Sequence, residues 1–383
     1  MKRIIILLGI FLSLGLQDCY PTNDIEISLL TCSSGSASFE SWGHSAIRVN
    51  YNDEKETDIV YDFGRFDFST THFYWKFIKG KLRYGIGLKN THSFFNDYLL
   101  ENREIIEQKL NLSNKVKHEI IKRLEYLYKP ENRFYYYDFT DKNCTTQLRD
   151  LILNNFEKDT QKQITNKTYR IEINEFLKER QWIRFGINLV FGPSVDNEIN
   201  TKESMFLPYY LYSGFNDLSI NGRKLVNSEK RFNKVETNQS NLLTLLNPTL
   251  IFVVLLILIL FIKSPRIQIP IFIIIGLTGL SILLISIITE HQDLKNNFNL
   301  LWCNPLYLVA VFFQLKNNSS FQYYLSVTLQ LMIVGMIIIW IAKIQSWEIA
   351  FFPIVFILSI YNIRIIKTGY NSKIPASWVS VLR

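Results

Sequence analysis

The C-terminal part of the chain contains five apolar stretches, each about as long as a lipid bilayer is thick. They are Leu242–Ile262, Ile269–Ile288, Phe298–Leu315, Gln322–Ile341 and Trp347–Ile363. A helix needs about 20 apolar residues to cross a membrane, and the third and fifth stretches are the shortest. We therefore predict an all-α membrane domain of about five transmembrane helices at residues 242–366, followed by a cytoplasmic tail at 367–383.

The charges around these stretches predict which side of the membrane each loop faces. If the first helix enters from outside, the inner loops and tail hold seven Lys and Arg, whereas the outer loops hold two Lys and all three acids of this region. Cytoplasmic loops are generally enriched in Lys and Arg. The soluble part of the chain and the loop Glu290–Asn299 are thus both predicted to face outside. Most of the net charge of +8 belongs to this membrane region, so it does not indicate nucleic-acid binding.

Residues 1–19 read as a signal sequence or an N-terminal anchor. A Lys-Arg pair precedes the apolar run Ile4–Leu16, which is short for a spanning helix. Cys19 stands where a lipoprotein signal has its cysteine, although Gln17 and Asp18 fit that signal poorly. Cleavage, lipidation and retention remain three alternatives, and each places the next domain outside the cytoplasm.

Residues 24–220 have the pattern of a soluble α+β domain, and the polar residues 221–241 that of a linker. Ser113 is expected to cap one helix, which Pro130 ends, and Asn143 a second. Strands are expected from alternating or short apolar runs, namely at Glu26–Leu30, Ser45–Val49, Asp58–Phe63 and Ile106–Leu112.

Two motifs in this domain contain residues suited to acyl transfer. His44 follows Gly43 at the start of a predicted strand, where a base can reach a ligand. Cys144 follows Asn143 in the first turn of a predicted helix, where the positive dipole end favours a thiolate. A histidine beside that thiol would complete a minimal pair for acyl transfer through a thioester. Asp62 is the candidate to orient the imidazole, and Asp67 is the second choice.

Other patterns leave alternatives open. Cys32 and Cys144 are the cysteines of the soluble part, so one of them is reactive or the two form a disulfide. The aromatic and basic run His72–Lys79 rests on a membrane surface or packs against its own domain. The five helices are a plain anchor or, as we favour, give access to lipid or substrate.

Taken together, these motifs resemble a known family. Leu29–Gly35, Trp42–Arg48, Val60–Asp67, Asn132–Asp138 and Asn143–Asp150 occur in the order typical of the Lnb N-terminal periplasmic domain family of Bacteroidota. Glu290–Asp293 and Asn299–Pro305 resemble the C-terminal part of that family. The resemblance covers nearly the whole chain.

The resemblance implies a fold and a reaction. The family is similar to circularly permuted papain-like enzymes, including NlpC-type hydrolases and lecithin:retinol acyltransferase, so Cys144 is expected to be the nucleophile and His44 the base. Asp62 stands where permuted relatives often have a histidine. Lnb proteins are lipoprotein N-acyltransferases of the inner membrane. The implied reaction moves an acyl chain from a phospholipid to the N-terminal cysteine amine of a diacylated lipoprotein, without a metal or diffusible cofactor. We expect substrate contacts at Asn143, Arg48, Glu290 and His291.

Two other functions fit part of the pattern. An NlpC-type cell-wall amidase or peptidase would use the same Cys144 and His44, but it has no need of a multi-helix membrane domain. A non-enzymatic, membrane-anchored periplasmic binding protein would tolerate the loss of Cys144.

Overall fold

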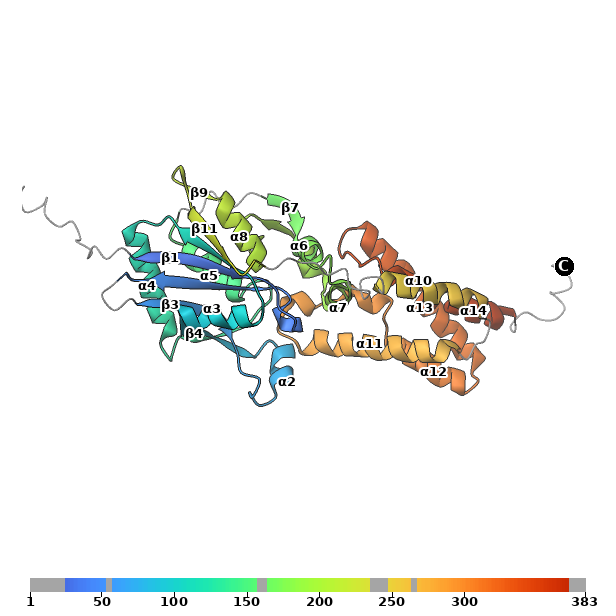
Figure 1. Ribbon diagram of the computed structural model, residues 1–383. Coiled ribbons are helices and arrows are strands. Elements are labelled where there is room, and N and C mark those ends of the chain that lie inside the picture. Colours follow the sequence, from blue (N-terminus) through green and yellow to red (C-terminus); the bar gives the residue numbers. More distant parts are fainter. Residues whose placement is uncertain (1–24, 53–56, 157–163, 235–246, 263–266, 372–383) are drawn as a thin grey trace, which may run out of the picture.

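The computed structural model describes residues 25–52, 57–156, 164–234, 247–262 and 267–371. A soluble α+β domain and a helical membrane domain lie end to end (Figure 1). The predicted signal or anchor, including Cys19, lies outside the described residues.

A seven-stranded antiparallel sheet in the order β11-β5-β1-β2-β3-β4-β6 forms the centre of the soluble domain. Its strands are β1 Glu26–Cys32, β2 His44–Asn50, β3 Asp58–Arg65, β4 Arg83–Asn90, β5 Ile105–Leu110, β6 Phe134–Tyr136 and β11 Val226–Phe232. Two further pairs are β7 Ile164–Thr168 with β8 Glu198–Asn200, and β9 Ser219–Ile220 with β10 Arg223–Lys224. The four strands expected from apolar runs are confirmed, within two residues at each end.

Helices cover both faces of this sheet, because successive strand residues point to opposite sides. Leu29 and Ile47 pack in one core with α4 Asn114–Tyr128, α5 Cys144–Leu153 and α8 Pro208–Asp217. Leu30 and Ala46 pack on the other face with α3 Thr91–Leu100. The predicted caps are confirmed: the side chain of Ser113 accepts a hydrogen bond from Val116 N–H, and Asn143 caps α5.

The prediction of a linker at 221–241 is wrong for its first half. β11 pairs along β5 and forms an edge strand of the main sheet. Most of its side chains are exposed, so the strand has no buried apolar face that the sequence would have revealed. Residues 235–241 lie outside the described residues.

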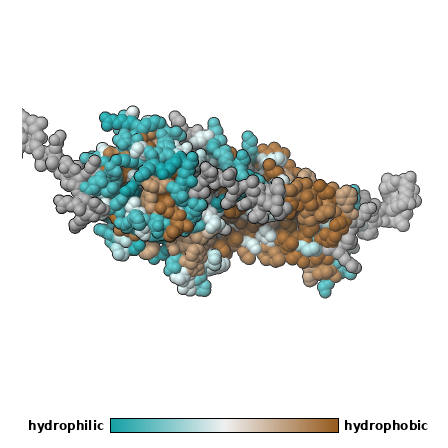
Figure 2. Space-filling model, viewed as in Figure 1, coloured by the Kyte–Doolittle hydropathy of each residue, from teal (hydrophilic) through white to brown (hydrophobic). Residues whose placement is uncertain are grey.

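The C-terminal domain confirms the prediction of about five membrane helices. Among the residues that the structure describes, four segments are long and apolar enough to cross a bilayer, namely Gln268–Ile288, Gln292–Leu315, Ser319–Ile341 and Phe351–Gly369, and Pro248–Phe261 is a shorter apolar helix. The helices are α10 Pro248–Phe261, α11 Gln268–Ile288, α12 Leu306–Leu315, α13 Ser319–Ile341 and α14 Phe351–Asn371. Many of their apolar side chains are exposed, among them Ile274, Ile287 and Leu331. Figure 2 shows these helices as an apolar block beside the polar soluble domain, as expected of a surface that faces lipid.

Three of the predicted segments have other bounds. The first helix begins at Pro248, after the Asn247 cap, and residues 242–246 lie outside the described part of the chain. The last helix begins at Phe351 and continues to Asn371, into the predicted tail. The third segment is not one helix, because only Leu306–Leu315 is α-helical. Short 3₁₀ turns precede it at Gln292–Leu294 and Phe298–Leu301.

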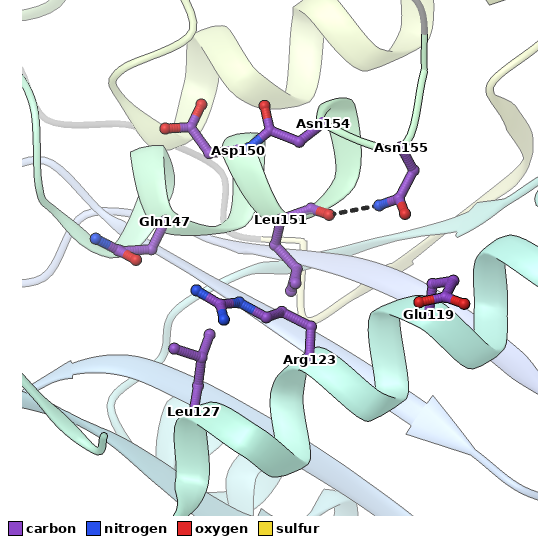
Figure 3. Close-up of a pocket in the computed structure, with 8 residues that line it drawn as sticks. All are labelled: Glu119, Arg123, Leu127, Gln147, Asp150, Leu151, Asn154 and Asn155. Carbon is purple, nitrogen blue, oxygen red and sulfur yellow. Dashed lines mark hydrogen bonds between the residues drawn. The ribbon is translucent and has the colours of Figure 1, made fainter. Parts of the chain in front are cut away.

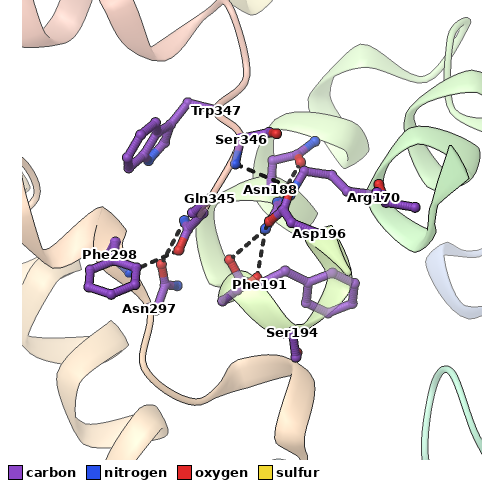
Figure 4. Close-up of polar contacts among 12 residues, drawn as sticks. Arg170, Asn188, Phe191, Ser194, Asp196, Asn297, Phe298, Gln345, Ser346 and Trp347 are labelled. Atoms are coloured by element: carbon purple, nitrogen blue, oxygen red, sulfur yellow. Dashed lines mark hydrogen bonds and ion pairs between the residues drawn. The ribbon is translucent and has the colours of Figure 1, made fainter. Parts of the chain in front are cut away.

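Polar contacts join the two domains at the helices α6 Tyr169–Phe176 and α7 Gln181–Val190 (Figure 4). Buried Arg170 is paired with Asp196, whose carboxylate also accepts a hydrogen bond from Ser346 N–H. The buried Asn299 donates to the Asn188 and Leu189 carbonyls of α7. Asn299 also accepts hydrogen bonds from the indoles that surround it, those of Trp302 and Trp347. These contacts satisfy the polar groups of the broken third segment and fix the soluble domain to the membrane domain.

Candidate active site

Cys144 is the first residue of α5, and Asn143 holds that helix end in place. The Asn143 side-chain oxygen accepts hydrogen bonds from Thr145 N–H at 2.8 Å and Thr146 N–H at 2.9 Å. Its amide donates to the carbonyls of Phe139 and Phe206. Asn143 is 6% exposed, and both ends of its amide are engaged. The structure thus places this predicted substrate ligand as the helix cap that positions Cys144.

His44 is the first residue of β2, and its backbone position depends on Gly43. Gly43 has φ +77°, and a Cβ there would lie 2.5 Å from the Cys32 carbonyl oxygen, so the turn requires glycine. The His44 Nε2 lies 2.5 Å from Oδ1 of Asp62 in β3. The ring lies beside Cys144, since a Cβ on Gly64 would lie 3.4 Å from Cys144 Cβ and 3.9 Å from His44 Cε1.

The structure chooses between the two aspartates considered for the third position. Asp62 is buried, and its second oxygen is paired with Arg65 Nε at 2.9 Å. Asp67 is exposed and accepts hydrogen bonds from Ser69 instead. The fold therefore brings together Cys144, His44 and Asp62.

The electrostatics of these three side chains favour a charged pair. Burial disfavours the Cys144 thiolate, but the charge and hydrogen bond of His44 outweigh burial and lower the thiol pKa. The Ser45 N–H also lowers it. Burial likewise opposes the charged form of His44, yet Cys144 and Asp62 raise the pKa of its ring. Both shifts stabilise a thiolate beside an imidazolium, which is the state of a reactive cysteine.

The other cysteines described lack this environment. Cys32 and Cys144 are both free thiols, so the alternative of a disulfide between them is excluded. Burial raises the pKa of the Cys32 thiol far above its ordinary value, and Cys303 is buried in the membrane domain. Cys144 is thus the reactive candidate.

Three tyrosines near Cys144 were not predicted. Tyr84 and Tyr137 stack with ring centroids 4.6 Å apart. Burial is the largest cause that raises the pKa of both tyrosines, and a charged Cys144 raises it further. Burial and then Cys144 also raise the pKa of Tyr135. The Tyr135 hydroxyl is buried without a hydrogen-bond partner among the described residues. The signal in the sequence is the run Tyr135–Tyr137, nine to seven residues before Cys144.

Arg48 does not reach this group. It lies four residues from His44 along β2, about 13 Å at the rise of a strand. Its guanidinium is paired with Asp58 and Glu107 at 2.6 and 2.8 Å. Its role in substrate binding stays a prediction.

The outer loop that follows α11 contacts the soluble domain, so the prediction that both lie on one side is confirmed. His291 Nε2 lies 3.1 Å from the Phe77 carbonyl, and Nδ1 lies 3.5 Å from Asp138. Glu290 is exposed and paired with Lys81. His291 thus supports the loop before α5 through Asp138, and Glu290 supports the loop that contains Lys81. The contact of either residue with a substrate stays a prediction.

The groove between α4 and α5 contains none of the candidate residues (Figure 3). It is lined by Glu119, Arg123, Leu127, Gln147, Asp150, Leu151, Asn154 and Asn155. Within the described residues, no three His, Cys, Asp or Glu side chains are grouped to hold a metal ion.

Two family profiles match the chain, one for each domain. The Lnb N-terminal periplasmic domain matches residues 16–174, and the Lnb transmembrane domain matches residues 237–373. No curated protein and no solved structure matches the chain. The two matches together cover well over half of the residues and contain Cys144, His44 and Asp62 as well as the outer loop. The chain therefore belongs to the Lnb family, as a membrane protein with a periplasmic domain and a connection to lipoprotein processing.

Proposed function

We propose that this protein is a lipoprotein N-acyltransferase of the inner membrane. It moves an acyl chain from a phospholipid to the N-terminal cysteine amine of a diacylated lipoprotein. The observation that carries the proposal is the Cys144–His44–Asp62 group on a periplasmic domain that is fixed to a membrane domain. Both substrates are lipids or lipid-anchored, so such an enzyme has to hold its nucleophile at a bilayer surface.

The first half of the reaction acylates Cys144. The thiolate attacks the ester carbonyl carbon of the phospholipid, and the ester C–O bond breaks. The leaving lysophospholipid alkoxide takes a proton from the His44 imidazolium, and a thioester remains on Cys144. Asp62 keeps the imidazole oriented and stabilises its charged form.

The second half transfers the acyl group. The neutral amine of the lipoprotein attacks the thioester carbonyl and gives a proton to His44. The C–S bond breaks, an amide forms, and the thiolate–imidazolium pair is restored. The reaction needs no oxidant and no metal, since every proton that moves is held by His44.

The negative oxygen of each tetrahedral intermediate needs hydrogen-bond donors. The N–H groups of Thr145 and Thr146 are not available, because Asn143 accepts both. The Cys144 N–H has no partner among the described residues, and the Tyr135 hydroxyl is likewise unpartnered. We assign these two groups as the oxyanion donors.

The experiment is to determine the acylation state of a lipoprotein by mass spectrometry in cells with wild-type or variant protein. Cys144→Ser should leave the lipoprotein diacylated, while Cys32→Ala, the matched control at a buried thiol, should leave it triacylated. Triacylation by the Cys144→Ser variant would overturn the proposal. Loss of cell-wall cleavage in that variant, with lipoproteins unchanged, would favour the amidase instead. If the Cys144→Ser variant changes neither lipoprotein acylation nor cell-wall cleavage, the result would favour a binding protein.

A further inference from the structure

Helix α2, Phe73–Ile78, exposes large apolar side chains in the soluble domain. None of its residues is buried. Tyr74 is 73% exposed, Trp75 51% and Phe77 41%. Phe68 in the loop before it is 55% exposed. Such a gathering of exposed aromatics on one projection requires a partner that covers it.

The residues that follow the apolar helix α11 contact the C-terminal end of α2. Thr289, the residue after α11, donates through its hydroxyl to the Ile78 carbonyl at 2.8 Å. The next N–H, of Glu290, donates to the Lys79 carbonyl at 3.1 Å. These contacts satisfy carbonyls at the C-terminal end of α2. Ile287, two residues earlier on α11, is 70% exposed on the surface that faces lipid. The residue that contacts α2, Thr289, is therefore less than one helical turn along the chain from the exposed Ile287.

The charges around α2 also suit a bilayer surface. No acidic residue occurs from Phe68 to Asn96, whereas this segment holds five Lys and Arg. Lys81 and Lys89 are paired with Glu290 and Asp97, so the positive charge near α2 comes from Lys76, Lys79 and Arg83. Lys79 lies over the Trp75 ring, 4.8 Å from its centroid. Tyrosine, tryptophan and lysine together are typical of the interface between lipid tails and water, and the basic residues attract anionic headgroups.

A series of aromatic contacts leads from α2 toward Cys144. The ring centroids of Phe73 and Phe68 lie 4.8 Å apart, and those of Phe68 and Phe66 lie 4.9 Å apart. The ring centroids of Phe66 and Tyr84 lie 5.1 Å apart. Gly64, two residues before Phe66, directly adjoins the nucleophile, since a Cβ on Gly64 would lie 3.4 Å from Cys144 Cβ. Figure 2 shows apolar atoms in the region of α2, beside the apolar membrane domain.

We propose that α2 and the loop before it form a lipid-binding surface, which lies in the outer leaflet and holds the acyl chains of a phospholipid along Phe73, Phe68 and Phe66 toward Cys144. Its occupant is bilayer lipid, because the surface is continuous with the membrane helices through Thr289 and Glu290. The delivery of the lipid to Cys144 rests on the proposed function, whereas the contact with lipid does not.

The test is photocrosslinking of the full-length protein in nanodiscs of phosphatidylethanolamine and phosphatidylglycerol. The Cys144→Ser background prevents turnover, so an adduct reports contact alone. Benzoylphenylalanine replaces Trp75 or Phe68 in turn. Tyr126 on α4, 46% exposed, is the matched control away from the membrane domain, and Ile287 is the positive control. Intact-mass spectrometry should find a phospholipid adduct at 75, 68 and 287 and none at 126. An adduct at 287 without one at 75 would overturn the proposal, as would equal adducts at 75 and 126.

A second measurement separates this proposal from the proposed function. The triple variant Tyr74→Ser, Trp75→Ser, Phe77→Ser should form the Cys144 thioester about tenfold more slowly than wild type, while Tyr126→Ser does not slow it. Alkylation of Cys144 by iodoacetamide should be unchanged in the triple variant, which shows that the site is folded. If lipid adducts form but the wild type forms no thioester, the acyltransferase proposal fails and the lipid surface stands. Normal acyl transfer in the triple variant would overturn the delivery role.

Discussion

Thr140, four residues before the proposed nucleophile Cys144, donates a hydrogen bond of 2.9 Å to Asp293 in the outer loop of the membrane domain. Asp293 is buried, and it accepts a further hydrogen bond from Ser194. Its backbone carbonyl accepts from Gly192 N–H at 2.7 Å. One residue of the membrane domain therefore supports the loop that leads into the α5 cap, so the geometry around Cys144 depends on both domains.

Asp293 should make stability depend on pH. Burial first, and then the charge of Asp138, raise its pKa from 3.8 to about 6. The folded state thus holds this proton more tightly than the unfolded chain, and stability is lost as the pH rises from about 4 to about 6. Asp293→Asn cannot ionise, so it should gain about 1–3 kcal/mol relative to wild type between pH 4 and pH 7.

Thermal unfolding in detergent at several pH values measures this difference between variant and wild type. The control is Asp67→Asn, because Asp67 is exposed and its pKa lies below the ordinary value. That control should show no gain with rising pH. A difference for Asp293→Asn that stays constant from pH 4 to pH 7 would contradict the assignment.

Asp62→Asn should make Cys144 less reactive at neutral pH. Without the carboxylate, the His44 pKa falls, the imidazolium is less populated and the thiol pKa rises. The rate of iodoacetamide alkylation at pH 7 should therefore drop, by up to about tenfold for each unit that the thiol pKa rises above 7, and its profile should move to higher pH. Asp67→Asn should leave the profile in place, and an unmoved profile in Asp62→Asn would remove Asp62 from the site.

Tyr135→Phe tests the second oxyanion donor. The variant keeps the ring in the core and removes only the hydroxyl, so thioester formation should slow on the order of 10²-fold. Alkylation of Cys144 by iodoacetamide has no oxyanion and should stay within about twofold of wild type. Tyr84→Phe is the matched control, because Tyr84 lies beside Cys144 in the same cluster. An equal loss in both variants would indicate packing rather than a hydrogen bond.

Labelling of single cysteines tests the orientation in the membrane. Position 293 in the outer loop is unsuitable for a probe, because Asp293 is buried. Glu290 and Asn317 are both exposed and lie at opposite ends of the membrane domain. In a background with Cys19, Cys32, Cys144 and Cys303 all changed to Ser, a membrane-impermeant maleimide should label Glu290→Cys from outside, and Asn317→Cys only after permeabilisation. The reverse pattern would overturn the predicted topology.

The positions of Cys144, of His44 and of the helix cap were predictable because they depend on local patterns. Asn143 before Cys144 is a cap signal, and Gly43 before His44 is a turn signal. The sequence could not decide between Asp62 and Asp67 as the partner of His44, because that contact comes from the packing of two strands. Tyr135 was missed because a tyrosine run gives no sign of which hydroxyl will be left without a partner.

Long apolar helices were also predictable, whereas their ends and breaks were not. Hydropathy does not distinguish Phe298–Leu315 from a continuous helix, yet the buried Asn299 and Asn304 form side-chain hydrogen bonds in its first half. The bonds of Asn299 involve α7, which is more than 100 residues earlier in the chain. β11 was missed for a similar reason, since an exposed edge strand is defined by its neighbour β5 and not by its own side chains.

The contacts of Asn299 with α7 have a consequence for how often Cys144 meets a substrate. A domain on a flexible tether samples a volume above the bilayer, and its active site spends only part of the time at the surface. A domain joined to its membrane helices through Asn299 and Ser346 keeps one height and one tilt. Any molecule anchored in the same leaflet then finds Cys144 by lateral diffusion in two dimensions, at a rate set by its surface density rather than by its concentration in solution.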